Sequence, residues 1–170
     1  MSCDNGTAKP TLTADQVLPV QYGELNDILG FHLRLANVAL FQDYQATMGD
    51  LSLTPKQFAV LELILINPGT SQIGLAQSLR MDKATMMAII NKLEARNAIE
   101  RRQSKIDRRR QELFVTEDGQ KLVDTARQLR SEHEARFTTR FSADELKMLF
   151  GFLNRIYAGA KIPAYEEDEA

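Results

Sequence analysis

The sequence predicts a mainly α-helical fold with one small β-hairpin, and three observations lead to this prediction. Apolar residues recur every three or four positions in long stretches near both ends of the chain, as they do in amphipathic helices. In the middle third, Thr, Ser or Asp repeatedly precedes such a stripe, which is a helix-start signal. Segments 99–103 and 111–115 flank an exposed basic loop, which is typical of two paired strands.

Composition limits the function classes. The chain has 170 residues, of which 44% are hydrophobic, enough to bury a sizeable core in one domain or one core with extensions. Its only cysteine, Cys3, cannot form an internal disulfide, so we expect a cytoplasmic protein. A membrane-spanning helix needs about 18 consecutive apolar residues, and no apolar run in this sequence approaches that length. The N-terminus lacks a secretion signal, and we therefore expect no membrane partner.

The first half of the chain begins with an expected flexible arm, residues 1–19, which is rich in Thr, Asp, Asn, Gly and Pro. Apolar spacing then predicts a long helix over residues 23–48. A second helix starts where Thr54 can cap it, Pro55 takes its first position and Gln57 completes a capping box. The Asn-Pro-Gly sequence at 67–69 ends this helix.

Two short helices follow, and their spacing predicts a helix-turn-helix. Ser71 can cap the first, which runs to about Leu79, and Asp82 can cap the second, which Asn97 ends by adopting a left-handed conformation. One face of the second helix is apolar and should be buried. Its members are Met86, Ile89, Ile90 and Leu93.

The opposite face of that helix is small, polar or basic, which suits a helix laid in a DNA groove. Segment 101–110 then holds six basic residues and a single acid, Asp107. A basic hairpin directly after such a helix is the arrangement of a winged helix-turn-helix. The net charge of −2 does not argue against DNA, because residues 80–110 carry ten Lys or Arg against four Asp or Glu, a local +6.

The last third predicts two further helices. Thr116 should cap the first of them, with Glu117 and Asp118 in its first turn, where the helix dipole favours anions. Ser142 and Glu145 form a capping box for the second. Pro163 ends it, and residues 163–170 form an acidic tail.

Several motifs resemble those of the multiple antibiotic resistance regulator (MarR) family. Asp107, Arg108 and Arg109, followed by Thr116 and Gly119, are similar to its wing signature, and the Leu-Ala pair at 75–76 and the run at 92–94 extend the match to roughly residues 23–157. There are departures from the pattern. They are Val115 for leucine, Asn97-Ala98 where a glycine is preferred, and Ala88 where many members carry an arginine.

The resemblance implies a winged helix-turn-helix DNA-binding domain over residues 51–116 and a helical dimerisation region over 20–48 and 117–162. It also implies a homodimeric regulator, by default a repressor. A twofold dimer would bind an inverted repeat in double-stranded DNA with half-site centres about 10 bp apart. The alternative is that the apolar stripes close a monomeric helical core.

The candidate DNA-binding residues take different roles. Asn91 is expected at an adenine edge, and Met87 and the Thr85 methyl at thymine methyl groups, whereas lysines suit phosphates. The resemblance implies that Arg109 probes the minor groove and that Asp107 holds it or its neighbour. The full set is Gln72, Lys83, Thr85, Met87, Asn91, Lys92, Arg102, Lys105, Asp107, Arg108, Arg109 and Arg110.

A regulator of this family commonly responds to a small aromatic or amphipathic anion. A cation and an imidazole on one apolar helix favour an aromatic acid or its CoA thioester as the effector, although His32 also fits an ordinary interface residue. The candidate ligand-binding residues are Phe31, His32, Arg34, Phe41, Tyr44 and Phe58.

Two other classes remain as alternatives. A redox-responsive regulator of the same fold would use Cys3, which has only Lys9 as a nearby cation. A winged-helix module can also bind protein instead of DNA. We expect no enzyme, no cofactor and no metal site, because the chain has two histidines, no glycine-rich phosphate loop and no paired metal-ligand spacing.

Overall fold

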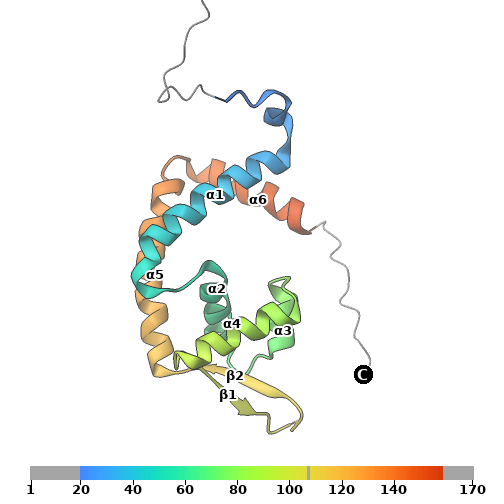
Figure 1. The fold of residues 1–170 in the computed structure, drawn as a ribbon, viewed down its shortest axis with the longest axis vertical. Helices are drawn as coiled ribbons and strands as arrows, with labels where there is room; N and C mark the ends of the chain where they lie inside the picture. Colours follow the sequence, from blue (N-terminus) through green and yellow to red (C-terminus); the bar gives the residue numbers. More distant parts are fainter. Residues whose placement is uncertain (1–19, 107, 159–170) are drawn as a thin grey trace, which may run out of the picture. The chain divides into compact units, whose positions relative to one another are not determined.

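The computed structural model describes residues 20–106 and 108–158, and within them the mainly helical fold with one hairpin is confirmed (Figure 1). The chain divides into two compact units, with the boundary between Val38 and Ala39, inside α1. The elements in chain order are η1 (Gly23–Asp27), α1 (Leu29–Met48), η2 (Gly49–Leu51), α2 (Pro55–Ile66), α3 (Gln72–Ser78), α4 (Lys83–Ala95), β1 (Ile99–Gln103), β2 (Gln111–Val115), α5 (Glu117–Thr138) and α6 (Ala143–Ala158), where η denotes a 3₁₀-helix.

The first unit corrects one prediction. The helix expected over residues 23–48 begins only at Leu29, because Ile28 has an extended backbone with φ −97° and ψ 111°. Before it lies a 3₁₀ turn, in which the Leu25 N–H donates to the Tyr22 carbonyl at 3.0 Å. A 3₁₀ turn also brings residues i and i+3 together, so the apolar spacing could not distinguish it from an α-helix.

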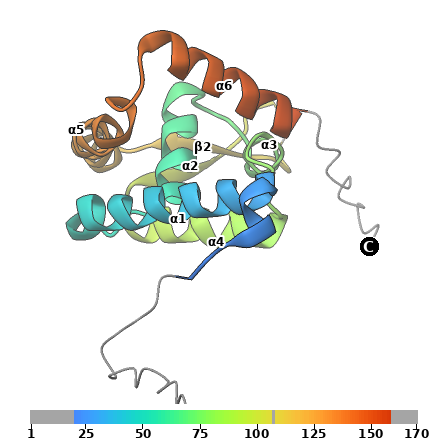
Figure 2. The same cartoon turned by 90° about the horizontal axis from the view of Figure 1, so that it is seen from above.

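In the second unit, α2 lies inside the lobe with α5 on one side and α3 on the other (Figures 1 and 2). The predicted capping box forms. Gln57 N–H donates to Thr54 Oγ1 at 3.2 Å, and Thr54 N–H donates to Gln57 Oε1 at 3.0 Å. The core side chains of α2 are fully buried. They include Val60, Leu61 and Ile64.

The helix-turn-helix of α3 and α4 is also confirmed. Ser71 Oγ accepts from the Gly74 N–H at 3.1 Å, and Asp82 Oδ1 accepts from the Thr85 N–H at 2.6 Å, so both predicted caps are made. Arg80 in the turn has φ +53°. The predicted inner face of α4 is at most 7% exposed. It consists of Met86, Ile89, Ile90 and Leu93.

The hairpin has the predicted strands in antiparallel register, with Ile99 opposite Val115 and Gln103 opposite Gln111. Thr70 pairs with Leu113, whose N–H donates to the Thr70 carbonyl at 3.0 Å. The loop before α3 therefore pairs with the edge of β2 that is opposite β1. This pairing connects the hairpin to the helix-turn-helix.

The first turn of α5 lies against the end of α4. Thr116 Oγ1 accepts from the Gly119 N–H at 3.0 Å, the predicted cap. A Cβ at position 119 would lie 1.9 Å from the Ala98 carbonyl oxygen, so only glycine permits this approach. Asn97, just after the end of α4, has φ +56°, which is the left-handed conformation predicted for this residue.

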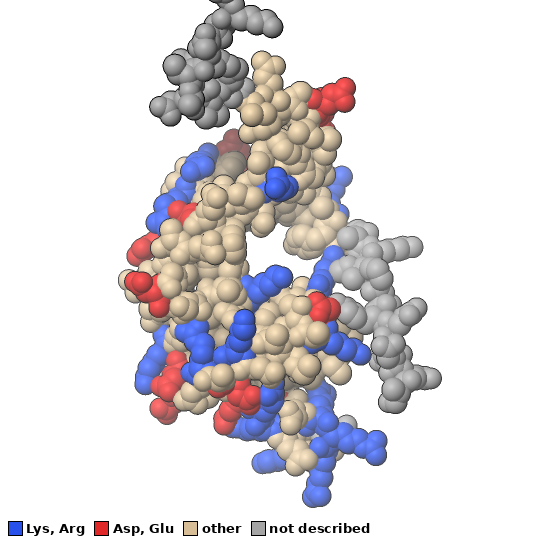
Figure 3. Space-filling view, viewed as in Figure 1, with Lys and Arg blue, Asp and Glu red and all other residues tan. Residues whose placement is uncertain are grey.

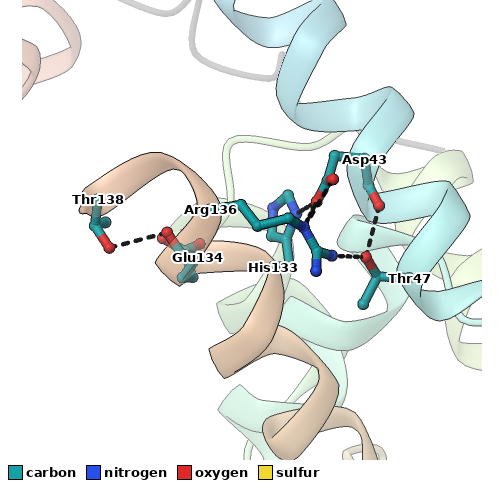
Figure 4. A network of polar contacts seen from close by, with 6 residues as sticks. All are labelled: Asp43, Thr47, His133, Glu134, Arg136 and Thr138. Atoms are coloured by element: carbon teal, nitrogen blue, oxygen red, sulfur yellow. Dashed lines mark hydrogen bonds and ion pairs between the residues drawn. The ribbon is translucent and has the colours of Figure 1, made fainter. Parts of the chain in front are cut away.

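Polar contacts join α5 to the part of α1 in the same unit (Figure 4). Asp43 accepts from His133 Nδ1 at 2.6 Å and from Arg136 Nε at 2.9 Å, and Arg136 also donates to the Thr47 hydroxyl. His133 is only 5% exposed. The side-chain hydrogen bond from His133 lowers the pKa of Asp43, and Arg136 lowers it further, against the opposing effect of burial.

Some predictions concern residues that the structure does not describe. The N-terminal arm with Cys3, the wing residue Asp107 and the acidic tail 163–170 lie outside residues 20–106 and 108–158. Within the described residues, every helix is too short or too polar to cross a membrane. The same residues contain no group of three His, Cys, Asp or Glu side chains that could hold a metal ion.

Candidate nucleic-acid interface

The outer face of α4 is open to solvent. Met87 is 49% exposed and is therefore not a core residue. Lys83, Asn91 and Lys92 are exposed as well. Thr85 is half-buried, and its hydroxyl donates to Asp82 Oδ2 at 2.6 Å. This bond and that from the Thr85 N–H lower the pKa of Asp82, so the Thr85 hydroxyl belongs to the helix cap.

The basic residues predicted in the wing gather on the hairpin. Figure 3 shows Lys and Arg side chains clustered at the lower end of the view, over the β1–β2 loop of Figure 1. The loop is held by backbone bonds, since the Ser104 N–H donates to the Arg110 carbonyl at 2.9 Å. The exposed cations of this cluster are Lys105, Arg108, Arg109 and Arg110.

Two further predicted residues are more constrained. The Arg102 guanidinium lies 4.4 Å from the centroid of the Phe114 ring and pairs with Glu100, although 58% of its side chain remains exposed. Gln72 is the first residue of α3 and is half-buried beside the Ser71 cap. Both lie in the same unit as α4, so the lobe brings together the described DNA-binding candidates.

Arg101 is not among the DNA-binding residues that the sequence predicts. Its Nη2 donates to Asn91 Oδ1 at 2.5 Å, and its Nη1 pairs with the Glu94 carboxylate, so this β1 side chain bonds two residues of α4. Strand alternation carried the signal, because Arg101 is on the same side of β1 as the buried Ile99. A cation on that side points toward the helix.

The candidate ligand residues are divided between the two units of the chain. Phe41 and Tyr44 line a cavity of about 340 Å³ between the end of α1 and the start of α2. Phe58 is buried in the core instead, with the Arg130 guanidinium 5.9 Å from its ring centroid. The other cavity residues are Gln45, Met48, Gly49, Ser52, Leu53, Thr54 and Pro55.

Phe31, His32 and Arg34 belong to the first unit. His32 Nε2 donates to the Asn26 carbonyl at 2.6 Å, so the imidazole is satisfied by its own unit. The Phe31 ring lies edge-on to Tyr22, with centroids 5.1 Å apart. Arg34 is exposed.

Tyr44 is the unusual member of the cavity wall. Its side chain is 7% exposed, and its buried hydroxyl has no hydrogen-bond partner within the described part of the chain. Burial raises its pKa to about 12. Its ring lies edge-on to His133 at 5.6 Å between centroids, which places the cavity next to the α1–α5 contact.

Comparison with known proteins gives consistent results. The MarR family model matches residues 53–110. A putative transcriptional regulatory protein for the hcr operon of Thauera aromatica is 33% identical over 137 residues, which are 80% of this chain and 82% of that protein. The transcriptional repressor CouR bound to a 23-mer DNA duplex has a TM-score of 0.78 and 32% identity, covering 82% of this chain and 99% of that chain. CouR bound to p-coumaroyl-CoA has a TM-score of 0.75 and 29% identity, covering 84% and 100%.

Proposed function

We propose that this chain, which belongs to the MarR family of DNA-binding transcriptional regulators, is a repressor. It binds an inverted-repeat operator as a homodimer. The observation that carries the proposal is the exposed outer face of α4 beside the basic loop of the hairpin in one lobe. A small aromatic acid or acyl thioester releases the protein from DNA.

In this proposal α4 enters the major groove. Asn91, Met87 and Thr85 meet base edges, and Lys83 and Lys92 meet phosphates. The wing reaches the backbone and the minor groove, where Arg109 is suited to a narrow, negative A·T-rich segment. The remaining proposed contacts are to phosphates and come from Gln72, Arg102, Lys105, Arg108 and Arg110.

Exposed apolar side chains support the homodimer. No residue of α6 is buried within the chain, although the helix is apolar along much of its length. An exposed apolar surface of this kind marks an interface. The large apolar side chains of α6 that are 42–58% exposed are Met148, Phe150, Phe152, Ile156 and Tyr157. A stable monomer in sedimentation at micromolar concentration would contradict the dimer.

The cavity supports a small-molecule effector. Its volume of about 340 Å³ lies at the lower end of the range of ligand pockets, and Phe41 offers an aromatic surface. One similar protein, CouR, is bound to p-coumaroyl-CoA. We place the aromatic part of the effector in this cavity.

A route from the cavity to α4 is available through Arg96, which directly follows the helix. Its guanidinium donates to the Ser52 carbonyl at 3.0 Å and to the Leu51 carbonyl at 2.8 Å. Ser52 lines the cavity and has φ +47°, a conformation held by its surroundings. A ligand in the cavity that shifts the loop at Leu51 and Ser52 therefore displaces the C-terminal end of α4.

The test titrates p-coumaroyl-CoA, and separately p-coumaric acid, onto the protein–DNA complex. We expect one of them to weaken DNA binding about tenfold or more, as coupling free energies of ~1–3 kcal/mol predict. Phe41→Ala should reduce this ligand effect and leave DNA affinity unchanged. Ile66→Ala, which removes an exposed side chain outside the cavity, serves as the control.

Two results separate the parts of the proposal. If calorimetry detects no binding of either compound, the effector class is wrong. If a compound binds but DNA affinity is unchanged, the proposed release mechanism is wrong.

A further inference from the structure

One side chain of β1, Arg101, forms hydrogen bonds with two side chains of α4. Arg101 donates from Nη2 to Asn91 Oδ1 at 2.5 Å and from Nη1 to the Glu94 carboxylate. Only 23% of its side chain is exposed, so it is packed between the hairpin and α4. Arg102, its neighbour, lies on the Phe114 ring on the opposite face of the strand.

The arrangement depends on the arginine fork. Asn91 and Glu94 are three residues apart on α4 and therefore lie on the same side of the helix. A planar guanidinium presents several N–H groups in fixed directions and can bond both acceptors at once, whereas a lysine ammonium behaves as a point charge. Arg101 thus fixes two side chains of the helix with one rigid group.

The contact fixes the orientation of the Asn91 amide. An arginine can only donate, so Asn91 must turn its carbonyl oxygen toward Arg101. The amide nitrogen, Nδ2, then faces away from the guanidinium and has no acceptor within residues 20–106 and 108–158. The free group that Asn91 offers is a hydrogen-bond donor.

We propose that Arg101 is a positioning residue for base recognition, which holds Asn91 so that it donates from Nδ2 to an acceptor in the major groove. This role rests on the proposed placement of α4 in that groove. Adenine N7, guanine N7 and O6, and thymine O4 are acceptors, whereas cytosine presents the N4 donor. Asn91 therefore selects against cytosine at one position of each half-site.

The test selects bound sequences from a randomised duplex library with the full-length protein and with Asn91→Ala, Arg101→Lys and the double variant. Arg101→Lys retains the positive charge, and we expect its ammonium to pair with Glu94 and leave the Asn91 amide free to rotate. Wild-type protein should disfavour cytosine about tenfold at one position, a size typical of a specific base contact. Asn91→Ala and Arg101→Lys should each lose most of this preference at the same position.

The double variant separates positioning from direct contact. If Arg101 acts through Asn91, the double variant has the same base preferences as Asn91→Ala. Arg101→Met, which keeps the side-chain stem and removes the charge, should give the same result as Arg101→Lys. Equal unfolding midpoints of all variants show that the fold is retained.

Three outcomes overturn the role. Arg101→Lys with wild-type preferences would show that charge alone matters. An Arg101 variant that changes a different position from Asn91→Ala would show that Arg101 reads DNA itself. A wild-type protein without any base preference would contradict both this role and the proposed operator binding.

Discussion

His133 Nδ1 lies 2.6 Å from Asp43 Oδ2, a contact that joins α5 to the C-terminal half of α1 across 90 positions of sequence. Arg136 bonds the same carboxylate and the Thr47 hydroxyl (Figure 4). The carboxylate therefore has two donors from α5. Because Tyr44, in the cavity wall, lies against His133, this contact is next to the proposed effector site.

The Asp43 contact predicts a pH dependence of stability. The hydrogen bond from His133 and the contact with Arg136 lower the pKa of Asp43 from the ordinary value of 3.8. The contribution of the ionised carboxylate to folding stability is therefore present above pH 3.8 and is lost as the pH falls through the lower folded-state pKa. Asp43→Asn should remove this part of the acid sensitivity. Urea unfolding midpoints between pH 6 and pH 2 measure it.

The control for this experiment is Asp50→Asn, which changes an exposed carboxylate of η2. It should retain the wild-type acid sensitivity. An Asp43→Asn variant with the same pH dependence as wild type would contradict the role given to the His133 contact.

Gly119→Ala should strongly destabilise the protein. The new Cβ would lie 1.9 Å from the Ala98 carbonyl oxygen and 2.8 Å from Val115 Cγ1, and the backbone at Ala98 must move to admit it. Overpacking of this kind costs at least ~2 kcal/mol in the free energy of unfolding. Gly49→Ala, whose Cβ would have no neighbour within 4 Å, should change it by less than ~0.5 kcal/mol. Equal midpoints for the two variants would refute the steric argument.

Tyr44→Phe should leave the free energy of unfolding unchanged or raise it by up to ~1 kcal/mol, because the buried hydroxyl has no partner among the described residues.

The raised pKa of Tyr44, about 12 against an ordinary 10.0, gives the sign of the pH effect on stability. Stability from the neutral phenol is present below pH 10 and is lost as the pH rises toward 12. Ultraviolet titration should show one tyrosine that ionises near pH 12 and is absent from the variant. A destabilisation above ~1 kcal/mol would reveal a hydrogen bond to the hydroxyl.

Arg109→Ala should lower operator affinity about tenfold or more, with a smaller loss on unrelated DNA, because a minor-groove arginine responds to groove shape. Arg102→Ala should weaken all sequences alike and reduce the salt slope by about 1, as expected for a phosphate contact. Binding isotherms at fixed salt compare the two. An unchanged isotherm for Arg109→Ala on the operator would contradict the minor-groove role of Arg109.

The sequence predicted most elements well because their signals are local. The caps at Thr54, Ser71, Asp82 and Thr116 each depend on a side chain and a backbone N–H within three residues. The two strands of the hairpin follow from the exposed basic loop between them. The 3₁₀ turn at η1 was not predicted, since apolar spacing alone is compatible with both helix types.

The missed contacts have a different cause. Arg101 meets Asn91 and Asp43 meets His133 only after separate elements have packed, and neither partner is marked by local sequence. The basic run at 101–110 identified the wing as a whole but did not distinguish Arg101, which bonds the helix, from Arg102, which lies on Phe114. That distinction required side-chain positions.

Operator binding is tested by fluorescence anisotropy of the purified protein on DNA from upstream of its own gene, with a scrambled duplex as control. Measurements at about 50 and about 200 mM salt report phosphate contacts, because each releases counterions. We expect tight binding to the upstream duplex, at least about tenfold weaker binding to the scrambled one, and a steep loss of affinity with salt. Weak binding that is equal on both duplexes, followed by a random-sequence selection that enriches no motif, would contradict operator binding.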